Sequence, residues 1–389
     1  MVNTKINAKI VAHSLSPQKE ELISVLATFP RIILAEVNTH RMLSKNTSSS
    51  RAIPFNKMLE AIQNDPFIPI AWQIDHKGMQ GQYYKHEEGN KPCVQNWLKA
   101  RDLAIKQASI LNNDEFITKQ LCNRLLEPFM WTTMLITGSK EGWDNFFNLR
   151  NPVYEWEYEE GVIKAKSKEE FLEMFIKRYP TNGKRELHDW EAVDENFDPV
   201  DSNFWRSINK GQAEIHMMAL AESIYDAMNE SNPTQLLPGM YHIPFRKQIN
   251  ELYPDVENDS EDVVKISVSM AARTSYTVVG EEKEVNYENL IALHDRLLMQ
   301  DPPHSSPFEH CARAMSDEEY YSSIKTSKYP VIIPKNDEDR EINGGVVNCE
   351  LYPQHLEYGK NIDKTMYGWC RNFKGFIPYR YMIDNKINL

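Results

Sequence analysis

Cysteine and long apolar runs are both scarce in this sequence of 389 residues. Its five cysteines are an odd number, and no two of them form a Cys-x-x-Cys pair. This pattern argues against a disulfide framework and a structural zinc site, so we expect reduced thiols and a cytoplasmic location. No run approaches the ~18–20 apolar residues of a membrane span. The N-terminal stretch MVNTKINAKIVAHSLS lacks an apolar core of signal-peptide length, so we expect no signal peptide.

Positive charge is in short supply as well, because the formal net charge is −12. A protein that coats nucleic acid needs a broad basic face, so this balance argues against that class. Local basic clusters are therefore candidates for binding individual anions. The hydrophobic content of 41% and the charged content of 26% are those of a globular chain. The length suits one large domain or two modest ones.

One stretch lacks acidic residues altogether. Residues 38–54, NTHRMLSKNTSSSRAIP, contain no Asp or Glu but are rich in Ser and Thr and carry Arg41 and Arg51. On a turn after a helix, these residues predict a cradle for phosphate or another anion, in which each charge-assisted hydrogen bond is worth roughly 1.5–3 kcal/mol. The alternative is a turn whose hydroxyls satisfy nearby backbone groups, and the spacing is equally compatible with it.

Two further patterns contain candidate site residues. Arg150 ends the predicted helix EGWDNFFNLR, where an arginine also interacts favourably with the helix dipole. His304, Glu309 and His310 lie in the run HSSPFEH, a candidate metal-ligand cluster. Their spacing differs from that of a zinc-binding helix, and Pro307 interrupts any helix there, so we expect no metal site.

Periodicity and capping signals predict an alternation of helices and strands. Strands are expected at residues 5–12, 129–137 and 264–269. Helices are expected at residues 17–29, 32–43, 94–112, 141–150, 168–178, 212–229 and 287–299. Ser16 and Ser139 are expected to cap two of these helices, and Asn113 or Asp114 to cap a further helix that ends near Pro128. Residues 63–91 are expected to form a long loop.

Five segments taken together resemble the motifs of the flavin-dependent thymidylate synthase family, the ThyX type. The family's Arg-His-Arg triplet, followed after seven residues by Ser, appears here as Thr39-His40-Arg41 and Ser49. The other four matching segments are NFFNLR, GQAEI, AARTSY and PHSSPFEH, at residues 145–150, 211–215, 271–276 and 303–310. The last two precede the triplet in common family members. Here they follow it, so the chain resembles the circularly permuted long homologues of large phages and some bacteria.

The resemblance implies an α+β, ThyX-like fold with a central β-sheet flanked by helices, circularly permuted and with an inserted subdomain. It also implies that residues 270–310 fold back onto residues 36–51 and 124–150. The corresponding division is a first core part at 1–151, an insertion at 152–209, a core helix and loop at 210–250, a linker at 251–263, a second core part at 264–320 and a loop-rich tail at 321–389.

The resemblance further implies a methyltransferase that moves a methyl group from methylenetetrahydrofolate to C5 of dUMP. FAD is the implied cofactor and NADPH and methylenetetrahydrofolate are the implied co-substrates, in sites between the subunits of a homotetramer. No membrane and no direct nucleic-acid partner is expected. The implied catalytic residues are Arg150 and His304. The implied nucleotide-binding residues are Arg41, Ser49, Ser50, Arg51, Arg124 and Arg150. The implied cofactor-binding residues are His40, Asn46, Asn145, Ser275, Ser306 and Glu309.

Four departures from the family pattern leave other outcomes open. Thr39 stands where the family has Arg, and Glu36 stands where it has Gln. Thr47 stands where an acid is common, and residues 139–141 (SKE) replace the family's Asn-x-Arg. A carboxylate near the base accepts a hydrogen bond from a cytosine amino group, so dCMP and hydroxymethyl transfer stay alternatives. A non-catalytic nucleotide-binding homologue is another. Cys93, in a Lys-Pro-Cys-Val run, is the candidate nucleophile of a cysteine-dependent thymidylate synthase, although a structural role for this cysteine is favoured.

Overall fold

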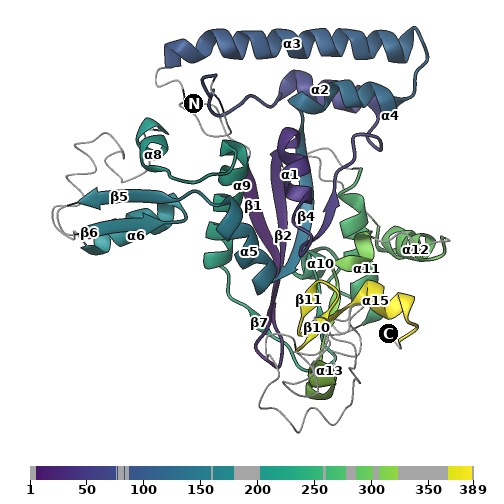
Figure 1. Cartoon of the computed structure of the whole chain (residues 1–389). Coiled ribbons are helices and arrows are strands. Elements are labelled where there is room, and N and C mark those ends of the chain that lie inside the picture. The colour runs from purple at the N-terminus through teal and green to yellow at the C-terminus, as the bar shows by residue number, and fades with distance from the viewer. Residues whose placement is uncertain are drawn as a thin grey trace, which may run out of the picture.

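A five-stranded mixed sheet forms the centre of the molecule, with the strand order β3-β4-β2-β1-β7 (Figure 1). Strands β1 (Asn7–Leu15), β2 (Glu21–Pro30) and β4 (Trp131–Ser139) are the long members, and β2 pairs antiparallel with both of the others. The short strand β3 (Ser44–Thr47) pairs antiparallel with β4, and β7 (Thr234–Gln235) pairs parallel with β1. The expected α+β fold with a central sheet is confirmed.

The structure is a computed structural model. It describes residues 6–75, 77, 83, 87–158, 161–178, 202–256, 260–276, 286–300, 306–322 and 367–387. His304 and most of the expected loop-rich tail therefore lie outside the described residues.

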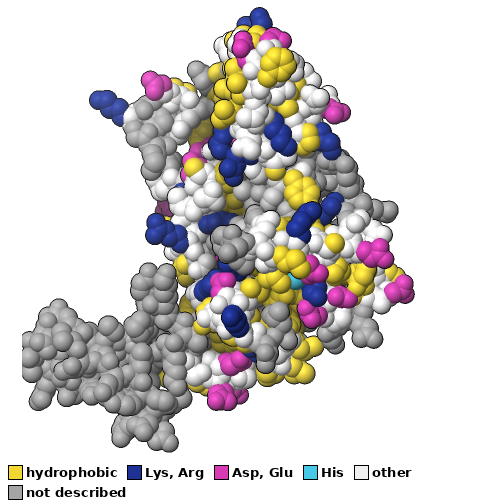
Figure 2. All heavy atoms as spheres, turned by 90° about the vertical axis from the view of Figure 1, so that its right-hand side faces the viewer, with side chains coloured by type: hydrophobic (Ala, Val, Ile, Leu, Met, Phe, Trp, Pro, Cys, Tyr) yellow, Lys and Arg dark blue, Asp and Glu magenta, His cyan; other side chains and the backbone are white. Residues whose placement is uncertain are grey.

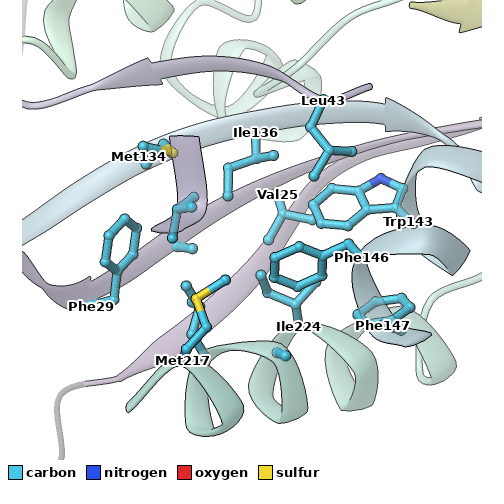
Figure 3. Close-up of a cluster of buried hydrophobic side chains, with 14 of the residues drawn as sticks. Val25, Phe29, Leu43, Met134, Ile136, Trp143, Phe146, Phe147, Met217 and Ile224 are labelled. Carbon is cyan, nitrogen blue, oxygen red and sulfur yellow. The ribbon is translucent and has the colours of Figure 1, made fainter. Parts of the chain in front are cut away.

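Helices α5 (Lys140–Arg150) and α9 (Ile215–Asn229) cover one face of the sheet. Because alternate residues of a strand point to opposite faces, Val25 and Phe29 of β2 join this core, whereas Leu26 packs on the other side. Figure 3 shows the packed side chains Val25, Phe29, Leu43, Met134, Ile136, Trp143, Phe146, Phe147, Met217 and Ile224.

Helices α10 (Arg246–Leu252), α11 (Glu261–Arg273) and α12 (Tyr287–Leu298) form the second core, which contains Leu135 of β4. The strand expected at residues 264–269 is wrong, because this run lies inside α11. In residues 266–269, serines alternate with apolar residues, which is the pattern expected of a strand with one polar face. Ser267 and Ser269 are instead buried and donate to backbone carbonyls of neighbouring segments at 2.8 and 2.6 Å.

A separate helical layer contains α2 (Phe55–Asn64), the long α3 (Glu87–Asn113), α4 (Lys119–Cys122) and the 3₁₀ helix η2 (Asn123–Phe129) (Figure 1). These helices share one hydrophobic cluster. Helix α3 begins inside the expected 63–91 loop. The next helix is capped by Thr118, whose Oγ1 accepts from Gln120 N at 3.1 Å, so the expected cap at residue 113 or 114 is wrong.

A small subdomain with its own aromatic cluster lies within the expected insertion. It contains β5 (Tyr154–Tyr158), β6 (Gly161–Ala165), α6 (Lys168–Arg178) and α8 (Ser202–Ile208). Glu222 of α9 joins this subdomain to the main core. Its carboxylate accepts from Lys168 N at 2.8 Å and from Lys168 Nζ at 2.7 Å, which satisfies the N-terminus of α6.

The described end of the chain packs against the core. Strand β12 (Phe376–Pro378) pairs with β9 (Ala312–Ala314), which pairs with β8 (Tyr241–His242). A hairpin of β10 (Trp369–Cys370) and β11 (Phe373–Lys374) precedes β12, and α15 (Tyr379–Asp384) follows it. Helix α13 (Asp317–Ser322) lies close to this hairpin, where Tyr320 and Cys370 share a cluster.

Most expected elements are confirmed, but two helices near the N-terminus are not. The helix expected at 17–29 is wrong, because residues 21–30 form β2. Strands β1 and β4 pair with its two edges, and the two hydrophobic cores cover its two faces, so its run of apolar residues imitates a helix. The helix expected at 32–43 is shortened to η1 (Arg31–Ile33) and α1 (Leu34–Asn38). Ser139 occupies the N-cap position of α5, but its Oγ accepts from Lys374 N at 2.7 Å.

A chain of buried polar side chains runs through the sheet. His242 bonds Ser14 Oγ through Nδ1 and Ser24 Oγ through Nε2, each at 2.8 Å. Ser24 Oγ lies 2.6 Å from Thr137 Oγ1, which lies 2.8 Å from His310 Nδ1. His242 and His310 are fully buried, and burial lowers the pKa of each to about 3. Both histidines are therefore neutral at physiological pH.

Acid should destabilise the protein through these two histidines. Unfolded histidine titrates near pH 6.5, so below that pH the unfolded state binds protons that the folded state excludes. Between about pH 6 and pH 4, the free energy of unfolding should fall by about 1.4 kcal/mol per pH unit for each histidine. Denaturant unfolding of the wild type and of His310→Asn over this range measures the difference. An unchanged pH slope in His310→Asn would contradict the prediction.

Candidate functional site

The amide of Asn46 joins three segments that are remote in sequence. Its Nδ2 donates to Ala271 O at 2.5 Å and to Thr274 Oγ1 at 2.8 Å. Its Oδ1 accepts from Ser275 Oγ at 3.2 Å and from Ser306 Oγ at 2.9 Å. An amide has two donor hydrogens and two acceptor lone pairs, and all four face partners here. The one hydroxyl hydrogen of Ser306 is shared between Asn46 Oδ1 and Lys45 O, which also lies at 2.9 Å. We call this cluster the Asn46 junction.

The serine turn, residues 48–53, follows β3 and lies beside the junction. Ser49 N donates to Ser275 O at 2.8 Å, which ties the turn to the end of α11. The cations around the turn are Arg31, Arg51, Lys119 and Arg124, of which Arg51 and Arg124 are exposed. Figure 2 shows several Lys and Arg side chains across the middle of the face that carries α11 and α12, despite the overall negative charge.

One acidic side chain supports the serine turn from behind. Ser50 is buried, and its Oγ donates to Glu127 Oε1 at 2.5 Å. Arg31 Nη2 lies 3.3 Å from the same oxygen. The hydroxyl hydrogen of Ser50 is therefore used inside the protein, and it is not offered to a ligand at the surface.

Arg150 meets His40 at the end of α5. Arg150 Nε donates to His40 Nε2 at 3.0 Å, and Nη2 donates to Thr39 Oγ1 at 3.4 Å. Burial, together with the charges of Arg150 and Lys45, lowers the pKa of His40 to about 4. His40 is therefore neutral at pH 7 and acts as an acceptor. Among the described residues, nothing accepts a hydrogen bond from Arg150 Nη1, and the guanidinium keeps donors for a ligand.

A glycine and an aromatic contact position His40. A Cβ on Gly138 of β4 would lie 2.4 Å from Leu43 Cδ2, so a larger residue there would require the Leu43 side chain to shift. The His40 ring packs edge-on against Phe146 of α5, with 4.8 Å between the ring centroids. These contacts hold His40 beside α5 and place it next to Arg150.

Glu309 ends the 3₁₀ helix η3 (Ser306–Glu309) and lies near the C-terminal helix α15. Burial raises the pKa of Glu309, while the charges of Arg371 and Arg380 and a hydrogen bond with Ser44 act in the opposite direction. Both arginines bind Asp384, with nitrogen–oxygen distances of 2.6 and 2.9 Å. Residues of the tail thus contribute charge beside η3.

The structure gathers some predicted site residues and leaves others apart. Asn46, Ser49, Ser275 and Ser306 meet at the junction, and His40 contacts Arg150. His40 precedes β3 and the serine turn follows it, so the two are separated by about 13 Å of strand at roughly 3.3 Å per residue. The other described candidates are Arg41, Arg51, Arg124 and Asn145, which are exposed, and Ser50 and Glu309, which face Glu127 and the tail.

Sequence reasoning missed the residues behind the serine turn. Arg31, Asn123 and Glu127 all contact the turn, yet Glu127 is 77 residues from Ser50. A single sequence holds no signal that links them. The contribution of Arg371 and Arg380 was missed for the same reason.

Within the described part of the chain, no group of three or more His, Cys, Asp or Glu side chains is arranged to hold a metal ion. The described helices also lack the combination of length and apolar character that a membrane span requires.

No family model and no curated protein sequence matches the chain. Among solved structures it is similar to the UMP/dUMP methylase PolB from Streptomyces cacaoi bound with 5-Br dUMP, at 12% identity over 54% of this chain and 98% of that chain, with a TM-score of 0.32. It is also similar to thymidylate synthase X from Helicobacter pylori with FAD and dUMP, at 16% identity over 33% of this chain and 58% of that chain, with a TM-score of 0.22. These TM-scores are too low to establish a common fold.

Replacing Asn46 should destabilise the protein, because Asn46→Ala removes all four hydrogen bonds of the junction. At about 1 kcal/mol for each bond, we expect the free energy of unfolding to fall by about 2–4 kcal/mol. Asn145→Ala is the matched control, because Asn145 is exposed on α5 and its loss should change stability by less than about 0.5 kcal/mol. Denaturant unfolding measures both variants. Equal stabilities would contradict a structural role for the junction.

Proposed function

We propose that this protein is a flavin- and folate-dependent methyltransferase that acts on C5 of a pyrimidine deoxynucleotide, with dUMP as the first candidate. The observation that carries the proposal is the Asn46 junction, where Ser275 and Ser306 meet the strand that leads into the serine turn. These residues belong to the segments that resemble the flavin-dependent thymidylate synthases. A circularly permuted form of that fold, acting as a homotetramer with NADPH as reductant, is part of the proposal.

The serine turn is the proposed binding site for the 5′-phosphate. Exposed Arg51 and Arg124 flank a turn that contains no acid, and guanidinium groups bind phosphate with paired hydrogen bonds. Ser49 and these two arginines are the proposed direct contacts. Arg41 precedes β3, on the side of His40, and its proposed nucleotide-binding role rests on the resemblance alone. Ser50 is assigned to the support of the turn, because its hydroxyl already bonds Glu127.

Arg150 is proposed to bind and polarise the pyrimidine ring. Neutral His40 accepts a hydrogen bond from Nε of the Arg150 guanidinium. This contact fixes the plane of the guanidinium without adding a second positive charge. The remaining donors then face the ligand. A fixed positive charge beside the ring stabilises the negative charge that develops on the base as C5 reacts.

FAD is the proposed cofactor, and when bound it would supply the hydride transfer. The residues at the junction fit its hydroxyl-rich ribityl and ribose parts. Ser275 and Ser306 donate to Asn46, so their oxygens remain acceptors for ligand hydroxyls, and Glu309 adds a carboxylate. Asn46 itself is fully bonded and is assigned a positioning role. Flavin-contacting roles for His40 and Asn145 and a catalytic role for His304 remain part of the proposal from resemblance alone.

One observation favours dCMP as a second candidate substrate. Glu36 Oε2 is buried and has no hydrogen-bond partner among the described residues. Thr39, which contacts Arg150, also donates to Glu36 O at 2.6 Å, so this acid lies close to the proposed base site. A carboxylate is the natural acceptor for the amino group of cytosine. Transfer of either a methyl or a hydroxymethyl group is compatible with this arrangement.

The proposed activity is tested by the mass of the product. Purified protein is incubated with dUMP or dCMP, methylenetetrahydrofolate, FAD and NADPH. We expect the nucleotide to gain the mass of one CH₂ unit, and a gain of CH₂O would identify hydroxymethyl transfer. A protein that binds flavin and nucleotide without changing either nucleotide would be a non-catalytic homologue. Loss of turnover in Cys93→Ser would instead identify a cysteine mechanism.

Arg150→Ala should reduce turnover by roughly 10²–10³-fold or more, because it removes the charge that stabilises the reacting base. Flavin binding, followed by the visible absorbance of the protein, should be retained. Arg296→Ala is the control, since Arg296 is exposed at the end of α12 and should leave turnover unchanged. Full activity in Arg150→Ala would refute the role assigned to this residue.

A further inference from the structure

We propose that Arg31, Asn123 and Glu127 are positioning residues that orient the serine turn, so that the backbone N–H groups of Ser50 and Arg51, which have no acceptor among the described residues, face an anion. The inference rests on the proposed function, in which the anion is the phosphate of a pyrimidine nucleotide. None of the three residues needs to touch the ligand. They act through the backbone and the hydroxyl of the turn.

Asn123 binds the middle and the end of the turn. Its Nδ2 donates to Ser50 O at 2.6 Å and to Ile53 O at 3.0 Å, and the side chain is fully buried. Both amide hydrogens are used on backbone carbonyls, which fixes the orientation of the amide. A carbonyl that accepts from the interior points its negative end away from the surface.

Arg31 and Glu127 hold the first part of the turn. Arg31 Nη1 donates to Ser48 O at 2.8 Å, and Arg31 Nη2 lies 3.3 Å from Glu127 Oε1. Glu127 then accepts from Ser50 Oγ at 2.5 Å. The Glu127 carboxylate therefore links Arg31, which binds Ser48 O, to the hydroxyl of Ser50. Removing the carboxylate would release both contacts.

The remaining carbonyls of the turn, apart from that of Arg51, are also occupied. Ala52 O accepts from Lys119 Nζ at 2.9 Å, and Ser49 O accepts from Ala52 N and Ile53 N at 3.0 and 3.4 Å. Four backbone N–H groups of the turn are used inside the protein as well, because Ser48 N donates to Thr133 O, Ser49 N to Ser275 O, and Ala52 N and Ile53 N to Ser49 O. Among the described residues, Ser50 N and Arg51 N have no acceptor, so an anion in front of the turn would meet these two donors and the guanidinium of Arg51.

The same contacts also stabilise the turn, because without them the carbonyls of Ser48, Ser50 and Ile53 would lack donors. Arg31 is largely buried, and burial lowers its pKa, with the charge of Glu127 opposing that effect. A role in ligand binding is therefore separated from stability by measuring both in the same variants.

The variant Glu127→Ala distinguishes an effect of Glu127 on the orientation of the serine turn from an effect of its negative charge on the anion. Removing an acid beside an anion site should strengthen anion binding if charge alone decides. If Glu127 orients the turn, dUMP binding should weaken by at least about 10-fold, because Ser50 and Arg31 lose their common partner. Glu127→Gln, which keeps an acceptor oxygen, should restore most of the affinity. Glu115→Gln is the control, because Glu115 is exposed after α3.

The experiment combines calorimetric titration of dUMP with hydrogen–deuterium exchange of the amides of residues 48–53 in the free protein. We expect weaker dUMP binding and faster exchange in Glu127→Ala, with the rest of the sheet unchanged. Equal or tighter dUMP binding, or unchanged exchange, overturns the inference. If the wild type binds no dUMP, the proposed function fails, and titration of inorganic phosphate with the same variants still decides whether the three residues orient an anion site.

Discussion

The side-chain amide of Asn46 is the interaction on which the arrangement of the candidate site depends. Strand β3 is four residues long and lies at the edge of the sheet, so backbone pairing with β4 alone holds it weakly. Asn46 adds bonds to the end of α11 and to η3, and each of its polar atoms has a partner. The positions of the serine turn, Ser275 and Ser306 therefore depend on one another.

In the part of the chain that the structure describes, the positive charges of Arg150 and Lys45 are bonded to neutral acceptors and not to carboxylates, so these contacts do not neutralise them. His40 accepts from Arg150 without being protonated, and backbone carbonyls accept from Lys45 at the end of α1. Burial lowers the pKa of Lys45 to about 8. Among the described residues near the serine turn, Glu127 is the acid that pairs with a buried cation, Arg31, and it also accepts from the hydroxyl of Ser50.

The sequence predicted strands β1 and β4, the long helices and the meeting of Ser275 and Ser306 with the region of Asn46, because these features follow from local periodicity and from recognisable motifs. The prediction failed for strand β2, whose residues are almost all buried, so its periodicity does not separate helix from strand. It failed for helix α11 because buried serines alternate with apolar residues at 266–269. It also failed for Glu127 and Asn123, whose contacts with the serine turn depend on how η2 packs under it.

The sequence separations at the Asn46 junction set an order for assembly on the ribosome. Strands β1, β2 and β4 all lie within the first 139 residues and can pair early. Asn46 cannot complete its bonds until Ser306, 260 residues later, has been synthesised. At about 5–20 residues per second, that interval is roughly 10–50 s. During this interval β3 is an edge strand that lacks its bonds to Ser306. Exposed edge strands are prone to pair with other chains, so chaperones are expected to bind this region during translation.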